Sequence, residues 1–137
     1  MIAYLDSSVI LRIVLTQPDP LPEWDTIRIG ISSELLRTES HRTLDRMWLH
    51  GELNDAEYRH KRRSVEDLLN GFELVRVDSN VLAVASAPLP VSLGTLDAIH
   101  LATALIARST RDFIFATHDK ALARAAREMA LQVVGTI

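Results

Sequence analysis

The sequence predicts a single α/β domain of three layers (α/β/α), in which helices cover both faces of a central parallel sheet. Two observations predict this fold class. At 137 residues the chain is long enough for one hydrophobic core and too short for two ordinary domains. Short apolar segments also alternate with segments of helical period, an order typical of right-handed β-α-β units. We expect one domain over residues 1–137.

The N-terminal quarter of the chain predicts a strand, a helix and a second strand. Residues 2–5 form an apolar run that stops at Asp6 and two serines, residue types that cap helices. The apolar segment 9–15 predicts the helix, and prolines at alternate positions of segment 17–22 prevent it from continuing. Alternating apolar side chains over residues 27–31 predict the second strand.

The middle of the chain predicts two long helices followed by a third strand. The serine pair 32–33 is expected to cap a helix that ends near Leu49, and a second helix begins at Asn54. Its end is marked by an Asn-Gly pair at 70–71. The alternating segment 72–77 then predicts the third strand.

The C-terminal part predicts three more helices and two strands. Asp78 is expected to cap a short helix to about Ala87, and Thr95 a helix that continues through Ala107. The apolar run 113–116 predicts a buried strand. The remaining elements are a helix over 120–130 and a last strand over 132–134.

Composition restricts the chemistry and the cellular compartment. The absence of cysteine excludes disulfides, thiolate metal sites and a cysteine nucleophile. The first residues lack the basic character of a secretory signal and no apolar run suffices for a membrane helix, so we expect a cytoplasmic protein with no membrane partner. The net charge of −3 disfavours a strongly basic surface for nucleic acid. If four acids gather in one site, the remaining surface becomes slightly positive and stays compatible with a polyanionic substrate.

Four acidic residues are candidates for a common site. In parallel sheets, ligands bind beyond the carboxyl ends of the strands. Asp6 follows the first predicted strand and Asp119 the fourth, so their carboxylates converge if those strands are neighbours. Asp97 lies in the first turn of the helix before the fourth strand, and Glu39 lies two turns into the helix after the second. Glu34 lies about 140° away from Glu39 on that helix, so only one of the two faces the site.

Four short strings carry a resemblance to a known family: YLDSS at 4–8, SELLRTE at 33–39, TLDAIHLATA at 95–104 and THD at 117–119. With them the chain resembles the PIN-domain nucleases, and specifically the VapC-type toxins of bacterial toxin–antitoxin pairs. The likeness spans residues 2–134.

The resemblance implies a metal-dependent endoribonuclease that hydrolyses RNA and leaves a 5′-phosphate and a 3′-hydroxyl. It also implies a cognate antitoxin protein that inhibits the enzyme, and a homodimer. The acidic positions of the family match the four candidate acids, and its hydroxyl residue matches Thr117: Asp6, Glu39, Asp97, Asp119 and Thr117 are the expected catalytic residues.

We expect the cofactor to be Mg²⁺ or Mn²⁺, because hard divalent cations take oxygen ligands and clustered carboxylates repel one another without a cation. Asp6 and Asp97 are expected to bind the metal, and Glu39 to hold or deprotonate the attacking water. Asp119 either supports this site from outside or binds a second ion, and Thr117 orients Asp119 or touches a phosphate.

Other interpretations were weighed against this one. Asp6, Asp97 and Asp119 each occupy a helix start, where a carboxylate also serves as a cap. A haloacid-dehalogenase-type phosphatase needs a second acid two residues after the first, where this chain has Ser8. A response-regulator receiver domain would use Asp78 as phosphoacceptor, but it needs an acid pair after the first strand, which is absent. A catalytically inactive PIN-like module that binds RNA or protein stays as the alternative.

Three further side chains are expected to have roles other than catalysis. His100 shares a helical stripe with Asp97 and is expected to be a hydrogen-bonded histidine at the margin of the core. His118 is expected to be a solvent-facing turn residue. Trp48, on the first long helix, is a candidate for contact with a partner.

Overall fold

The computed structural model describes residues 1–108 and 112–136. In this part of the chain one five-stranded sheet forms, with every neighbouring pair parallel and the strand order β3-β2-β1-β4-β5. The strands are β1 (Ile2–Leu5), β2 (Ile29–Ser33), β3 (Phe72–Val75), β4 (Phe113–Ala116) and β5 (Gln132–Val134). The predicted parallel sheet is confirmed.

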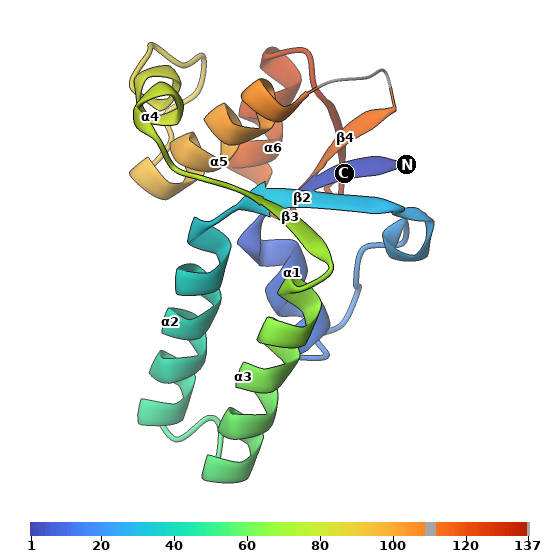
Figure 1. Ribbon diagram of the computed structural model, residues 1–137, viewed down its shortest axis with the longest axis vertical. Coiled ribbons are helices and arrows are strands. Elements are labelled where there is room, and N and C mark those ends of the chain that lie inside the picture. Colours follow the sequence, from blue (N-terminus) through green and yellow to red (C-terminus); the bar gives the residue numbers. More distant parts are fainter. Residues whose placement is uncertain (109–111, 137) are drawn as a thin grey trace.

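Helices cover both faces of this sheet, as Figure 1 shows. One layer consists of α1 (Ser7–Val14), α2 (Leu35–Leu49) and α3 (Asp55–Leu69), and the other of α4 (Ser79–Ala85), α5 (Thr95–Ala107) and α6 (Lys120–Glu128). Because strand side chains alternate between faces, each layer has its own apolar core. Leu5 packs in the core that α1, α2 and α3 share, and Tyr4 in the core beneath α5 and α6. The three-layer prediction is confirmed.

Two element boundaries differ from the sequence prediction because of contacts across the sheet. Residues Ser32 and Ser33, expected as a helix cap, belong to the end of β2. The hydroxyl of Ser32 donates to the carbonyl of Leu5 in the neighbouring strand at 2.6 Å, which satisfies a buried polar group inside the sheet. The Ser33 hydroxyl still accepts the N–H of Leu35 at 3.1 Å, so one serine does serve the helix start.

Smaller corrections concern the ends of other elements. The third strand ends at Val75, two residues early, because the chain leaves the sheet toward the cap at Asp78. Gly94, and not Thr95, is the N-cap of α5. A short 3₁₀ helix over Trp24–Thr26 was not predicted, since a single turn carries too little periodicity to detect.

The strand order places a topological switch point between β1 and β4. From β1 the chain continues to β2 and β3 on one side, whereas β4 and β5 lie on the other. Leu5 pairs with Ala116 at the carboxyl ends of these strands, and the N–H of Asp6 donates to the carbonyl of Ala116 at 3.2 Å. Asp6 and Thr117 therefore leave the sheet side by side, where parallel α/β folds bind ligands.

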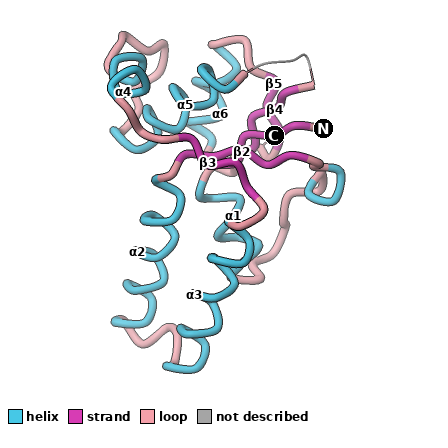
Figure 2. Tube along the Cα trace, viewed as in Figure 1, coloured by secondary structure: helices cyan, strands magenta, loops and turns pink. Residues whose placement is uncertain are grey.

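The antiparallel helices α2 and α3 form an arm that extends far from the sheet, as the trace in Figure 2 makes plain. A capping box at Asn54 begins α3, where the Asn54 side chain accepts the N–H of Glu57 at 2.8 Å. Trp48 and Tyr58 stack near the tip with ring centroids 4.6 Å apart. Among the described residues, no helix combines the length and apolarity needed to cross a bilayer.

Candidate active site

Asp6 is the most buried of the candidate acids and is held by four donors. It directly follows β1, caps α1 and is only 3% exposed. Its Oδ1 accepts the Ser8 hydroxyl at 2.5 Å and the N–H groups of Ser8 and Val9, while its Oδ2 accepts the Thr117 hydroxyl at 2.6 Å. Burial raises the pKa of Asp6, and the hydrogen bonds from Ser8 and Thr117 partly offset this rise. Since Oδ2 has a single donor, it keeps a lone pair free for a further ligand.

Thr117 is fully buried and joins the two strand ends. Its hydroxyl donates to Asp6, and its oxygen accepts the N–H of Asp119 at 3.0 Å. The carboxylate that it touches is therefore Asp6, and its bond to Asp119 is made through the main chain. Gly135 makes this arrangement possible, because a Cβ there would lie 2.3 Å from the carbonyl oxygen of Thr117 and its φ is +102°.

Asp119 caps α6 and lies at the carboxyl end of β4. Its Oδ1 accepts the N–H of Leu122 at 2.8 Å, as the helix-cap interpretation requires. Within residues 1–108 and 112–136, its Oδ2 has no hydrogen-bond partner. The same carboxylate thus serves the helix and keeps one oxygen available.

Asp97 shows that the four acids are close enough to interact. It lies in the first turn of α5 and is half-buried. Burial raises the pKa of Asp97, and the negative charges of Asp119, Asp6 and Glu39 raise it further. The four acids, which come from four different segments of the chain, therefore lie near enough for their charges to act on Asp97.

Glu39 differs from the other acids because a histidine binds it. Its side chain is 15% exposed, and its Oε1 lies 2.5 Å from Nε2 of His100. On its other side, Nδ1 of His100 lies 2.6 Å from the hydroxyl of Tyr4. The prediction that His100 is buried and hydrogen-bonded is confirmed. His100 was not predicted as a site residue, although its position one turn after Asp97 placed it near the acids.

Two neighbouring residues complete this picture. Glu34 turns away from the site, because its Oε1 accepts the N–H of Val77 at 2.9 Å. His118 was expected to face solvent, and this expectation is wrong. The His118 ring is half-buried, its Nδ1 lies 2.9 Å from the carbonyl oxygen of Gly135, and its buried Nε2 has no partner among the described residues.

The donor set fits a hard divalent cation held by few protein ligands. Within the described part of the chain, no three Asp, Glu or His side chains are arranged to hold a metal ion together. Mg²⁺ needs only one or two carboxylates, since it keeps several waters. Asp6 and Asp97 are two carboxylates of this cluster, and no described arginine or lysine forms an ion pair with any of the four acids. Among the described residues, the basic side chain that contacts this cluster is His100, at Glu39.

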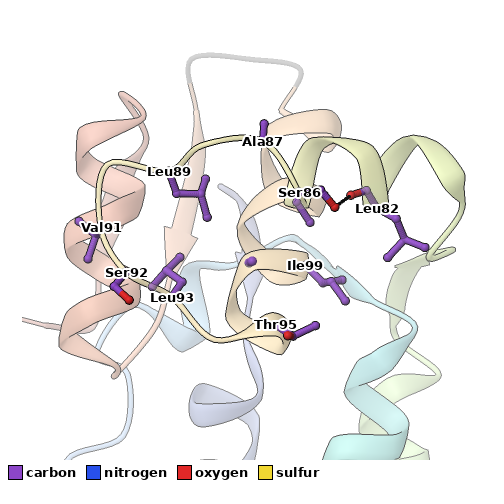
Figure 3. A pocket seen from close by; sticks show the side chains of 11 residues that line it. Leu82, Ser86, Ala87, Leu89, Val91, Ser92, Leu93, Thr95 and Ile99 are labelled. Atoms are coloured by element: carbon purple, nitrogen blue, oxygen red, sulfur yellow. Dashed lines mark hydrogen bonds between the residues drawn. The ribbon is translucent and has the colours of Figure 1, made fainter.

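A separate hollow lies between α4, the loop 86–93 and the start of α5, and Figure 3 shows the side chains that line it. Its volume is about 600 Å³, and most of the residues that line it are apolar, among them Leu82, Leu93 and Ile99. None of the four acids lines this hollow. It offers no charged group for phosphate chemistry.

Comparisons with known proteins agree with this geometry. The family model described as "PIN domain" matches residues 3–128. Ribonuclease VapC46 of Mycobacterium tuberculosis is 39% identical over 104 residues, which cover 74% of this chain and 72% of that protein. Ribonuclease VapC47 of the same species is 30% identical and covers 92% and 90% of the two chains. The solved VapBC2 structure from Rickettsia felis, bound to a DNA fragment from its promoter, shares the fold with a TM-score of 0.66 at 12% identity, over 100% of this chain and 99% of that chain. The chain belongs to the PIN-domain family.

Proposed function

We propose that this protein is a metal-dependent endoribonuclease of the VapC type, which hydrolyses RNA phosphodiester bonds. The observation that carries the proposal is the cluster of four carboxylates beyond the ends of β1 and β4, with no arginine or lysine partner among the described residues. Such a cluster costs stability unless a cation binds. Two relatives that cover about three quarters or more of this chain are ribonucleases by name, which supports RNA as the substrate.

In this proposal Asp6 and Asp97 hold the cation, Mg²⁺ or Mn²⁺. When bound, the ion supplies Lewis-acid polarisation of the phosphate and activation of a water nucleophile. The protein holds the Asp6 carboxylate rigidly, because the Ser8 and Thr117 hydroxyls both donate to it. The free lone pair of Asp6 therefore has a fixed orientation. Asp119, with one oxygen bound to its helix start, supports this site or serves a second ion.

Glu39 is the residue that we assign to the attacking water. Its Oε1 is occupied by His100, whereas Oε2 has only a long 3.5 Å contact from the Ser7 hydroxyl. Oε2 is therefore free to accept a proton from water. The water oxygen then bonds to phosphorus, the P–O bond to the 3′-oxygen breaks, and that oxygen takes up a proton. The products are a 5′-phosphate and a 3′-hydroxyl, without a covalent intermediate.

We further propose that the protein acts in the cytoplasm, forms a homodimer and is inhibited by an antitoxin protein. The names of its relatives and of the solved VapBC2 structure support the antitoxin. The tip of the α2–α3 arm offers apolar surface for a partner, since Trp48 is 39% and Leu49 73% exposed. Co-expression with the neighbouring gene product and sizing of the purified protein test both partners.

The direct test incubates purified protein with structured RNAs in Mg²⁺, Mn²⁺ or EDTA, beside Asp6→Asn. The matched control is Asp67→Asn, which removes an exposed acid on α3. We expect cleavage with either metal, no cleavage in EDTA or by Asp6→Asn, and full cleavage by Asp67→Asn. Equal cleavage by Asp6→Asn would assign the activity to a contaminant. RNA binding without cleavage by the wild type would favour the inactive module.

A further inference from the structure

We infer that His100 is a positioning residue for Glu39, and that Tyr4 fixes the ring of His100 for this task. The inference rests on the proposed ribonuclease function, in which Glu39 handles the attacking water. It adds two side chains, Tyr4 on β1 and His100 on α5, to the four acids and Thr117, and links them to Glu39 on α2.

The contacts of His100 use both of its ring nitrogens. The side chain is 1% exposed, with Nε2 at 2.5 Å from Glu39 Oε1 and Nδ1 at 2.6 Å from the Tyr4 hydroxyl. Tyr4 is itself fully buried and stacks on Phe115, with ring centroids 5.4 Å apart and planes 5° from parallel. The ring of His100 is thus held on its Nδ1 side by a buried group that has little freedom to move.

The direction of these hydrogen bonds follows from the chemistry of the tyrosine. A tyrosine hydroxyl, whose usual pKa is about 10, keeps its proton at neutral pH. A protonated hydroxyl donates to Nδ1 of His100. Nε2 then carries the ring proton and donates it to Glu39 Oε1.

The consequence for Glu39 is a single fixed carboxylate. A glutamate has three rotatable bonds, and an unrestrained one at the edge of a site samples several rotamers. The bond from His100 occupies Oε1 and leaves Oε2 as the oxygen that is free for water. His100 acts through Glu39 and touches neither substrate nor metal in this scheme.

A second histidine–glutamate pair provides an internal control. On the same helix as Glu39, His41 Nε2 lies 2.9 Å from Glu66 Oε1. Here the partner is 43% exposed and belongs to the α2–α3 arm, and Nδ1 of His41 has no partner among the described residues. The two pairs have the same chemistry, but only His100 is linked to the acidic cluster.

The kinetic test compares matched substitutions at the two histidines. His100→Met keeps the volume but removes the donor, and His100→Gln keeps an N–H near the place of Nε2. We expect His100→Met to lower kcat about 10- to 100-fold with KM for RNA changed less than about 2-fold, as for other residues that orient an active-site ligand. His100→Gln should recover most of this loss, and His41→Met should leave kcat unchanged. The melting temperature of each variant is measured beside its kcat and KM, so that a loss of folding is distinguished from a loss of activity.

A spectroscopic test does not depend on turnover. In long-range ¹H–¹⁵N spectra of the metal-free protein, the His100 ring should show a proton on Nε2, and Glu39→Ala should shift that signal while leaving the signals of His41 in place. Wild-type kcat in His100→Met, equal losses in His100→Met and His100→Gln, or an unchanged His100 signal in Glu39→Ala would overturn the inference. If the wild type cleaves no RNA, the proposed function fails, and the spectra still decide whether His100 binds Glu39.

Discussion

The Thr117→Val substitution tests how the buried Asp6 carboxylate is held. Valine has nearly the shape of threonine but neither donates to Asp6 Oδ2 nor accepts the N–H of Asp119. A hydrogen bond to a charged group contributes about 1.5–3 kcal/mol, and the unpaired N–H adds about 1 kcal/mol. We therefore expect the free energy of unfolding to fall by about 2.5–4 kcal/mol at pH 7 in EDTA.

The pH dependence of this loss has a definite sign. Burial raises the pKa of Asp6 in the folded state, and the Thr117 hydrogen bond is one of the contacts that lower it, so the substitution raises the pKa further. An acid whose folded pKa exceeds its unfolded value destabilises the fold while it is charged. This cost disappears as the pH falls through the folded pKa toward the unfolded value of about 3.9. The difference between wild type and Thr117→Val should therefore shrink as the pH falls.

Urea unfolding at pH 7 and at pH 4.5 measures both effects. Thr117→Ser is the matched control, because it keeps the hydroxyl and removes only a buried methyl group. Thr117→Ser should lower the free energy of unfolding by about 1 kcal/mol at either pH. Wild-type stability of Thr117→Val at pH 7, or an equal loss at the two pH values, would refute the view that the Thr117 hydroxyl stabilises a charged Asp6.

Three further predictions follow from the same site. Asp97→Asn should raise the melting temperature of the protein in EDTA at pH 7, because burial and three neighbouring carboxylates raise the pKa of Asp97. The gain in melting temperature should fade as the pH falls toward the usual pKa of aspartate. An unchanged melting temperature at pH 7 would contradict the repulsion between Asp97 and the other three carboxylates. Millimolar Mn²⁺ should stabilise the wild type and lose this effect in Asp6→Asn, as thermal shift would show, while an equal shift in both would place the ion elsewhere. Gly135→Ala should lower the free energy of unfolding, measured in urea, by at least about 2 kcal/mol and by more than Gly51→Ala does. Both glycines have a positive φ, but only at Gly135 would a Cβ collide with Thr117.

Local signals were sufficient for most of the fold. Asp6, Asn54, Asp78 and Asp119 are N-caps in the structure, as their residue types and positions before helical segments predicted. The apolar run 113–116 is a fully buried strand, as its composition indicated. Such signals are readable because capping and periodicity depend on residues within a few positions of each other.

The sequence could predict the candidate site only if a particular pair of strands were neighbours in the sheet. The sequence predicted that Asp6 and Asp119 converge if their strands are neighbours, and pairing of β1 with β4 meets this condition. The sequence could not predict which atoms the site residues would contact. Thr117 was expected to orient Asp119 or a phosphate, whereas its hydroxyl donates to Asp6, 111 positions away in the chain.

By itself, the sequence determined the alternation of strands and helices and the four acids that lie at helix starts or on one helix face, since these depend on local periodicity and residue type. Only the tertiary structure decided that Ser32 belongs to the sheet and that His100 binds Glu39, 61 positions away. The reason is physical. A buried polar group takes whichever partner the packed layers bring within hydrogen-bond distance, and that choice is made between segments that no local pattern connects.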